Sequence, residues 1–405
     1  MLDKIKAAVE ARMNDTVRFL QEMVRIPSEN PPGRYEEIAE RVAAECRRAG
    51  LTAETIRTPD RILSELKLET PRLNVIGRLN GSGGAKTLIF NAHLDTVPVS
   101  TPEAWRCQPF AAEIVDGKVY GRGAADSKAR LAGYLAAIRA VQDLKIPLKG
   151  DIIYTATADE ETGGLAGPGY LVKEGILKGD YAIVEGRCGS VAYAMCGVLH
   201  AAVTTTGKAV HARNPEEGVN AIYRMVPLIA RLERYHTELR ARKSDVPGIP
   251  APTCSVGTIT GGVKTNVIPD RCTITVDRRV VPGEDPAQVW NGLRDVAAAA
   301  AKAVGYEATV EQILFAEPHL SDPDSALIRS LVANATAYRG APIPVAGSTG
   351  FGDARFFCNL LKIPTANYGP GREGTGAHAV NEHVYIEDLK EGATVCAATI
   401  LDLCR

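Results

Sequence analysis

Histidine and carboxylate side chains follow apolar, strand-like runs at several places in the sequence. In the segment Phe90–Pro98 an apolar run ends at His93, and Asp95 lies two residues further on. Residues two apart on an extended chain point to the same side. A carboxylate in that position can accept the second N–H group of a histidine and fix the tautomer that binds a metal. Asp95 could alternatively cap a turn.

Two further segments add acidic side chains. Asp126 stands where a glycine-rich loop meets a predicted helix, a usual place for functional groups and also for a helix N-cap. Another apolar run ends at Thr157 and is followed by three consecutive carboxylates, Asp159, Glu160 and Glu161. Such crowding is costly unless cations neutralise it. Because adjacent side chains point in different directions, one glutamate can bind a metal while the other transfers protons.

A fourth segment, Gly376–Glu382, places His378 in a loop of small residues. Alone, this residue could be any surface histidine. Together, the four segments offer His, Asp and Glu ligands of intermediate hardness, which suit zinc, cobalt or manganese better than magnesium or calcium. The sequence therefore predicts a metal centre assembled from distant parts of the chain.

The elements that must position these residues alternate between helices and strands. Helical periodicity and end signals predict helices, and short apolar runs bounded by turn residues predict buried strands. The predicted helices are Leu2–Val24, Arg34–Ala49 and Ala125–Leu144, and the predicted strands are Asn74–Arg78, Thr87–Phe90 and Asp151–Thr157. This alternation favours a layered α/β domain.

The pattern changes near Val198. Residues 198–315 read as strand, helix, two strands, helix and strand, which is long enough for a separate small domain. After Pro318 the α/β pattern returns. The sequence therefore predicts a catalytic, metal-binding domain formed by residues 1–197 and 316–405, with a small domain inserted at 198–315.

The composition excludes several classes of partner. Lys and Arg number 47 against 48 Asp and Glu, a balance that predicts no binding to nucleic acid or to an anionic membrane. No apolar run reaches the length of a membrane-spanning helix, and the charged N-terminal segment is unlike a signal peptide. The nine cysteines contain no C-x-x-C pair and predict reduced thiols in a cytoplasmic protein.

Taken in order, the four segments resemble the metallopeptidase family of acetylornithine deacetylase, succinyl-diaminopimelate desuccinylase, aminoacylase and glutamate carboxypeptidase. The resemblance covers nearly the whole chain, including the insert. It implies a large zinc-peptidase-like α/β/α catalytic domain with an inserted α+β lid or dimerisation domain of βαββαβ order. It also implies two divalent metal ions per subunit, which would be zinc, cobalt or manganese.

The resemblance assigns the metal ligands. His93 would bind one metal, Asp126 would bridge both, and Glu161 with His378 would complete the second site. The fifth ligand should be a carboxylate at the end of the predicted strand Asp180–Val184, which in this sequence is Glu185. The peptide bond after the bridging aspartate is expected to be cis.

The resemblance also assigns catalytic and substrate-binding residues. Glu160 would be the general acid/base. His211 would reach into the active site of a partner subunit, polarise the scissile carbonyl and help to stabilise the oxyanion, which implies a homodimer or higher homo-oligomer. Asn266 and Arg279 would hold a substrate carboxylate, Arg279 as a bidentate fork, although an arginine there could also form an ordinary ion pair. The residues expected to line the small-molecule substrate are Ser348, Thr349 and Gly350.

The sequence departs from the family pattern at two places. Relatives read D-M-K-G-G where this chain has Asp126–Arg130, and they follow the fifth ligand with Pro-Thr where this chain has Gly186–Gly189. We expect a hydrolase that cleaves the amide bond of an N-acyl amino acid or dipeptide through a metal-activated water. One alternative is an atypical C–N hydrolase that releases ammonia or an amine from a non-peptide, for example aromatic, substrate. Another is a catalytically inactive binding protein, against which the retained Glu160 argues.

Overall fold

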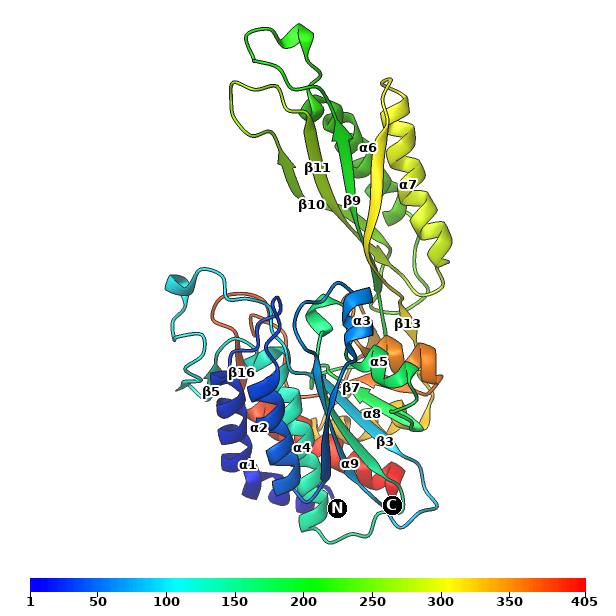
Figure 1. The fold of residues 1–405 in the computed structure, drawn as a ribbon. Helices are drawn as coiled ribbons and strands as arrows, with labels where there is room; N and C mark the ends of the chain where they lie inside the picture. The colour runs from blue at the N-terminus through cyan, green and yellow to red at the C-terminus, as the bar shows by residue number, and fades with distance from the viewer. The chain divides into compact units, whose positions relative to one another are not determined.

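The computed structural model describes residues 1–405, which form two compact units (Figure 1). Unit 1 comprises Met1–Tyr193, Ser321–Ala346 and Gly352–Arg405. Unit 2 comprises Ala194–Leu320 and Gly347–Phe351. The short stretch in unit 2, which sequence reasoning left in the catalytic domain, is held there by backbone hydrogen bonds from Gly347 N to Pro247 O and from Cys196 N to Ser348 O.

A mixed β-sheet forms the centre of unit 1. Its strands lie in the order β1-β2-β6-β3-β7-β15-β8-β13, and β14 also pairs with β8. β3 is parallel to β6 and β7, β15 is parallel to β7, and β1 and β2 run antiparallel at one edge. Every residue of β3 and β6 is buried, as expected for strands covered on both faces. The bounds are β1 Thr52–Arg57, β2 Leu73–Leu79, β3 Leu88–His93, β6 Ile152–Thr157, β7 Tyr181–Val184, β8 Val191–Met195, β14 Val345–Ser348 and β15 Thr365–Asn367.

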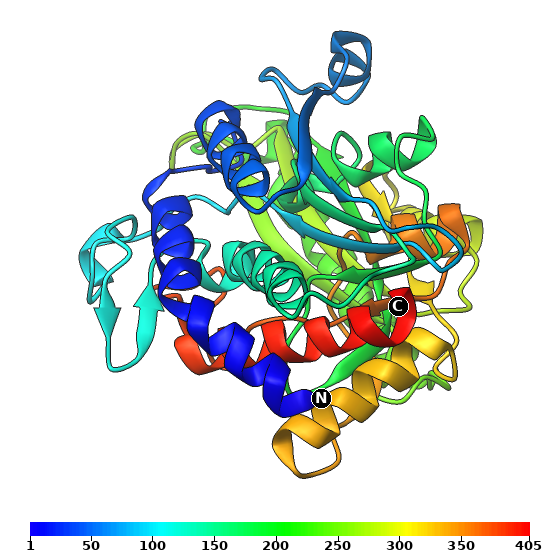
Figure 2. The same ribbon diagram turned by 90° about the horizontal axis from the view of Figure 1, so that it is seen from below.

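Helices cover both faces of this sheet. On one face α1, α4 and α9 pack against one another (Figure 2), and α2 packs on β1 and β2. On the other face α5 and the helical segment Phe356–Leu361 enclose a second apolar core. The helices of unit 1 are α1 Leu2–Arg25, α2 Glu36–Arg48, α3 Asp60–Glu65, α4 Ala129–Asp143, α5 Pro168–Lys173, α8 Ala326–Arg339 and α9 Ile386–Cys404. The predicted α/β/α architecture is therefore confirmed.

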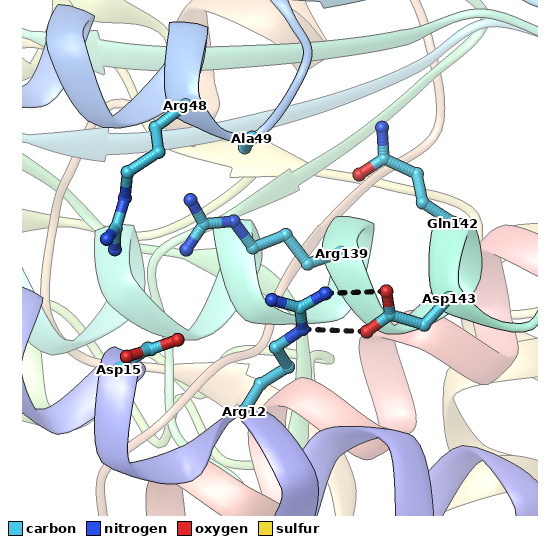
Figure 3. A pocket seen from close by; sticks show the side chains of 7 residues that line it. All are labelled: Arg12, Asp15, Arg48, Ala49, Arg139, Gln142 and Asp143. Carbon is cyan, nitrogen blue, oxygen red and sulfur yellow. Dashed lines mark hydrogen bonds and ion pairs between the residues drawn. The ribbon is translucent and has the colours of Figure 1, made fainter.

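One exposed ion pair and one buried carboxylate hold the helices of the first face together beside a surface pocket of about 180 Å³ (Figure 3). Arg12 of α1 donates two hydrogen bonds of 2.7 Å to Asp143 of α4. Glu45 of α2 is 1% exposed and lies 2.7 Å from both Arg48 and Arg139. Because Arg139 belongs to α4, Glu45 links α2 to α4.

Unit 2 has the predicted βαββαβ order. Its antiparallel sheet is ordered β10-β11-β9-β12, and α6 and α7 pack on it around a core that includes Leu199, Met225 and Leu293. The bounds are β9 Gly197–Thr206, α6 Ala221–Arg240, β10 Thr253–Gly261, β11 Arg271–Val280, α7 Pro286–Lys302, β12 Ala308–Ala316 and β13 His319–Leu320.

A small antiparallel sheet, in the order β16-β5-β4, completes unit 1. Its strands are β4 Ile114–Val115, β5 Lys118–Tyr120 and β16 His383–Tyr385. All nine cysteines are free thiols, and eight of them are buried. No helix of the protein combines the length and the apolar character needed to cross a membrane.

Candidate metal centre

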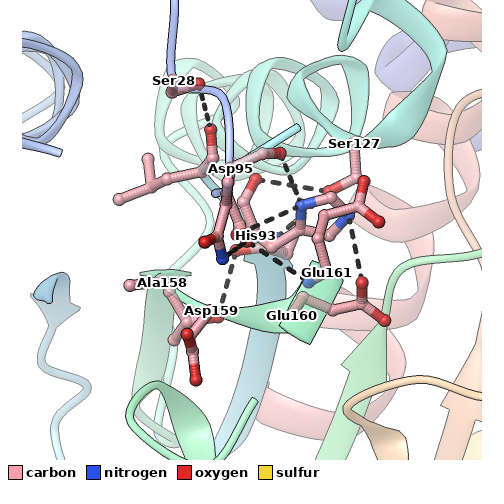
Figure 4. A network of polar contacts seen from close by, with 12 residues as sticks. Ser28, His93, Asp95, Ser127, Ala158, Asp159, Glu160 and Glu161 are labelled. Carbon is pink, nitrogen blue, oxygen red and sulfur yellow. Dashed lines mark hydrogen bonds and ion pairs between the residues drawn. The ribbon is translucent and has the colours of Figure 1, made fainter. Parts of the chain in front are cut away.

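The carboxyl ends of β3, β6 and β7 meet at one edge of the sheet because these strands are parallel. His93 is the last residue of β3, Glu160 and Glu161 come shortly after β6, and Glu185 directly follows β7. In open α/β sheets this edge is the usual place for a binding site. Figure 4 shows His93 together with Glu160 and Glu161 at this edge.

Two loops bring the other expected ligands to the same edge. The backbone of Ala124–Lys128 leaves helical geometry at Asp126, and α4 begins only at Ala129. The helix predicted from Ala125 onward is therefore wrong in its first turn. The peptide bond between Asp126 and Ser127 is cis, as expected. His378 lies in the loop between β15 and β16.

The carboxylate of Asp126 lies between the two histidines. Its Oδ1 is 3.2 Å from His93 Nε2, and its Oδ2 is 3.4 Å from His378 Nε2. His378 Nε2 is also 3.1 Å from Glu161 Oε2, and His93 Nε2 is 3.5 Å from Glu185 Oε2. The donor atoms thus form two groups that share Asp126.

Charge and burial make this cluster suitable for cations. The side chain of Glu161 is 5% exposed, and that of Glu185 is 13% exposed with neither oxygen accepting a hydrogen bond. Burial alone would lower the pKa of His93, but the carboxylates of Glu185 and Asp126 raise it well above its ordinary value. A divalent cation would satisfy these oxygens and replace the proton on the histidine. Imidazole and carboxylate donors fit zinc, cobalt or manganese.

Asp95 lies behind His93, but the closer contact is made by its backbone. His93 Nδ1 is 2.8 Å from the Asp95 carbonyl oxygen and 3.6 Å from its carboxylate. The carboxylate instead accepts hydrogen bonds from Asn30 Nδ2 and Glu161 N. A carbonyl can only accept, so Nδ1 carries the hydrogen and Nε2 is left for a metal. The group that fixes the tautomer of His93 is therefore the backbone carbonyl of Asp95, and not its carboxylate as the sequence predicted.

Comparison with known proteins identifies the family. The model of peptidase family M20/M25/M40 matches residues 89–402. The chain belongs to this family. It is 30% identical over 372 residues to succinyl-diaminopimelate desuccinylase from Cereibacter sphaeroides, which covers 84% of this chain and 94% of the relative. It is 31% identical over 339 residues to acetylornithine deacetylase from Myxococcus xanthus, covering 82% of this chain and 84% of the relative.

Solved structures support the fold of this M20-family protein. An M20 family metallo-carboxypeptidase from Sulfolobus solfataricus matches with a TM-score of 0.79 at 22% identity, covering 96% of this chain and 98% of the other. A dipeptidase from Saccharomyces cerevisiae matches with a TM-score of 0.82 at 15% identity, covering 100% and 98%. The resemblance read from the sequence is confirmed, and the M20-family protein is a metal-dependent hydrolase of amide bonds.

One supporting residue of the centre had no role in the sequence prediction. Glu382 Oε1 accepts hydrogen bonds from the backbone N–H groups of Ala125 and Asp126. Its Oε2 lies 2.6 Å from Arg122 Nη1, and both side chains are 1% exposed. Glu382 therefore shapes the loop that presents Asp126. The sequence contains one signal for this residue, since Glu382 lies four residues after His378 in the segment Gly376–Glu382.

Asp159 does not belong to the group of metal donors. Its Oδ1 lies 3.0 Å from Arg72 Nε, and both side chains are almost fully buried. Thr162 Oγ1 also donates a hydrogen bond of 2.6 Å to it. Of the three consecutive carboxylates, this one is thus neutralised by an arginine, and only Glu160 and Glu161 face the centre.

Unit 2 carries the remaining expected site residues of the M20-family protein at two separate places. Arg279 pairs in register with Val198 near the start of β9, and its Nε and Nη2 lie 2.9 and 3.1 Å from the oxygens of Asp277. Its guanidinium lies 5.7 Å from the ring centre of Phe351. The residues that lead up to Phe351 are Ser348, Thr349 and Gly350.

His211 and Asn266 lie beyond the other end of β9. Ala212 N donates a hydrogen bond of 3.0 Å to Asn266 O, and His211 forms a β-bridge with Val267. β9 has ten residues, which corresponds to roughly 30 Å at about 3.3 Å per residue. One subunit therefore does not bring Asn266 and Arg279 to the same substrate carboxylate.

Proposed function

We propose that this M20-family enzyme removes the acyl group from an N-acyl amino acid by hydrolysis at a centre of two divalent metals. The observation that carries the proposal is the carboxylate of Asp126, each oxygen of which faces a different histidine. Two curated relatives near 30% identity are a desuccinylase and a deacetylase. Their names favour an acylated amino acid over the aromatic amine of the alternative hypothesis.

The donor groups divide the ligands between two metals. His93 and Glu185 would hold one ion, Glu161 and His378 would hold the other, and Asp126 would contact both. Bound ions of this kind lower the pKa of a water molecule and polarise a carbonyl group. The imidazole and carboxylate donors narrow the metal to zinc, cobalt or manganese.

Glu160 is the residue placed to move the proton. Its Oε2 is 4.0 Å from His93 Nε2, so it borders the centre without being as close as the ligands. Burial raises the pKa of Glu160 well above its ordinary value, against the opposing charge of His93. In the reaction Glu160 accepts a proton from the attacking water and returns it to the leaving nitrogen. A raised pKa suits a group that must hold a proton between two steps.

Arg279 is the proposed anchor for the carboxylate of the substrate. Asp277 fixes its Nε and Nη2, and His200 Nε2 lies 3.1 Å from Asp277 Oδ2. The outer edge of the guanidinium remains for a second carboxylate. The loop that ends at Phe351 would line the same part of the substrate.

We also propose a homodimer formed through unit 2. Large apolar side chains are exposed on α6 and near the edge strand β10: Tyr223 is 75% exposed, Val226 58%, Ile259 56% and Val263 90%. Exposed apolar groups on one unit mark an interaction surface. In a dimer, His211 and Asn266 of one subunit would serve the centre of the other, because they lie far from Arg279 of their own subunit.

The test is turnover by protein reconstituted with zinc, cobalt or manganese. The panel contains N-acetyl and N-succinyl amino acids, dipeptides and aromatic amines, with released amine or ammonia as the readout. Hydrolysis of an N-acyl amino acid that stops on metal removal supports the proposal. Ammonia released from an aromatic amine, with no reaction of the acyl amino acids, would favour the atypical hydrolase. Full metal content without any turnover would favour a binding protein.

A further inference from the structure

The two departures from the family pattern touch each other in the structure. They are the segments Asp126–Arg130 and Gly186–Gly189. Arg130 Nε donates a hydrogen bond of 3.0 Å to the carbonyl oxygen of Gly186. A change in the first turn of α4 is therefore linked to a change in the loop after β7.

The backbone path at Gly186 has no room for a side chain. A Cβ atom on this residue would lie 2.4 Å from the backbone carbon of Asn367 and 2.4 Å from the backbone nitrogen of Tyr368. Contacts this short do not occur at real Cβ atoms, so only glycine can follow Glu185 along this path. Because glycine restrains the backbone least of all residues, the loop must be held in place by other groups.

Hydrogen bonds fix the peptide groups on both sides of Glu185. Its N–H donates to Asn91 O at 3.1 Å, and its carbonyl oxygen accepts from Asn367 Nδ2 at 3.0 Å. Arg130 holds the next carbonyl, that of Gly186. The Glu185 carboxylate itself has only the nearby groups of His93 and Ser127 as partners, so these backbone contacts fix where its side chain starts.

Glycines also leave the space that the Arg130 side chain fills. A Cβ on Gly369 would lie 3.1 Å from Arg130 Cγ, and one on Gly371 would lie 3.1 Å from Nη2. Arg130 is 9% exposed, and its Nη1 is buried without a hydrogen-bond partner. Burying a guanidinium in this way costs free energy unless nearby negative charge compensates it. The neighbouring negative charge is that of the metal ligands, since Arg130 acts electrostatically on Glu185.

We propose that Arg130 is a positioning residue for the metal ligand Glu185. By anchoring the Gly186 peptide, it holds the Glu185 carboxylate beside His93. The inference rests on the proposed function for the assignment of Glu185 as a ligand. The contact with Gly186 concerns the donor group of His93 and Glu185, because Glu161 and His378 lie in the other group, although the charge of Arg130 also acts on the shared Asp126.

The experiment is calorimetric titration of chelator-stripped protein with zinc, in the wild type and in Arg130→Met and Arg130→Ala. Methionine keeps the buried stem and removes the donor and the charge. We expect two zinc sites in the wild type, and in both variants one site weakened about 10- to 100-fold, as is typical when a group supporting a ligand is lost. The second site, which shares only Asp126 with the first, should change less than the first.

Arg187→Ala is the matched control. Arg187 is the next residue after Gly186, but its side chain is 53% exposed and pairs with Glu373, which is 89% exposed. It should bind both zinc ions as the wild type does. Arg130→Lys, which keeps the charge but not the planar fork, should show an intermediate loss at the same site.

Other results would overturn the inference. Two unchanged zinc sites in the Arg130 variants would show that Arg130 does not position Glu185, and would leave the proposed function intact. Equal weakening of both sites, together with a lower melting temperature of the metal-free variant, would show a general structural role instead. A wild-type protein that binds no zinc, cobalt or manganese would remove the proposed function itself.

Discussion

Carboxylates in the metal centre differ in role because their surroundings differ. Asp126 offers one oxygen to each histidine, and although burial opposes it, the hydrogen bond from His93 lowers the pKa of this carboxyl. Burial raises the pKa of Glu160, which has only a 4.0 Å contact to His93. A group that stays ionised suits a ligand, and a group that takes up a proton suits a general base.

At the residue scale we predict that zinc affinity rises with pH through neutrality. The carboxylates around His93 raise its pKa above the ordinary value, and the hydrogen bond that His378 donates to Glu161 does the same for His378. Metal binding must therefore displace protons, and the displacement becomes easier as pH rises towards and above these raised values.

Titration calorimetry at pH 6, 7 and 8 in buffers of different ionisation enthalpy measures this effect. For each proton displaced, affinity should increase about tenfold per pH unit below the histidine pKa. Proton release should fall as pH increases. An affinity that stays constant from pH 6 to 8, with no proton release, would contradict the assignment of these histidines as ligands.

At the element scale, Glu45 connects α2 to α4. It is 1% exposed and is surrounded by Arg41, Arg48 and Arg139. Burial alone would raise the pKa of Glu45, but hydrogen bonds from Arg48 and Arg41 outweigh it and lower the pKa. A lowered folded-state pKa means that the stabilisation is present above the unfolded pKa of about 4.3 and is lost as pH falls through the folded value.

We therefore predict that Glu45→Gln lowers the free energy of unfolding by about 2–4 kcal/mol at pH 7, because it leaves a buried arginine unpaired. The difference from wild type should shrink below about pH 4, where the wild-type carboxyl is itself protonated. Urea unfolding of chelator-treated protein measures both effects. The control is Glu40→Gln on the same helix, whose side chain is 72% exposed and should cost less than about 1 kcal/mol. Equal effects of the two substitutions would refute the role given to Glu45.

The helices and strands could be predicted from the sequence where local signals are sufficient. Apolar periodicity predicted a helix over Leu2–Val24, and the structure has Leu2–Arg25. The predicted helix start at Ala125 was wrong even though the residues there favour a helix. Glu382, more than 250 residues away in the chain, accepts the N–H groups of Ala125 and Asp126 and so holds the loop open.

The same distinction applies to the centre. His93 could be proposed because it ends an apolar run that predicts a strand, whereas Glu185 was proposed because the family resemblance implies a carboxylate ligand after the next strand. The pairing of Arg72 with Asp159 and the contact of Arg130 with Gly186 could not be predicted, because neither local pattern nor family pattern specifies them. Such contacts depend on which distant segments pack together, and only the fold determines that.

At the scale of the whole molecule, the expected substrate residues of unit 2 lie at opposite ends of β9. Arg279 lies near the start of this strand, and His211 and Asn266 lie beyond its end. If all three act on one substrate, two subunits must contribute them. The proposed dimer surface on α6 and β10 would make that possible.

We predict that the double substitution Tyr223→Glu and Val226→Glu on α6 converts a dimer to a monomer, because it places charge on the exposed apolar surface. The metal content should remain unchanged, and kcat/KM should fall at least about 100-fold, the usual loss when an oxyanion-stabilising group is removed. Light scattering and steady-state kinetics measure the two effects. Ile114→Glu, at a 49% exposed apolar position in unit 1, is the control and should leave both unchanged. A fully active monomer would contradict the contribution of His211 from a partner.

The most direct measurement of the central claim is hydrolysis of N-acetyl and N-succinyl amino acids by the zinc-loaded protein, with Glu160→Gln measured beside it. Glu174→Gln, an exposed glutamate of unit 1, is the matched control. We predict wild-type turnover, loss of about 100- to 10,000-fold in kcat for Glu160→Gln with two zinc ions still bound, and no change for Glu174→Gln. Turnover that survives in Glu160→Gln with its metals in place would contradict the role of Glu160 as the group that moves the proton.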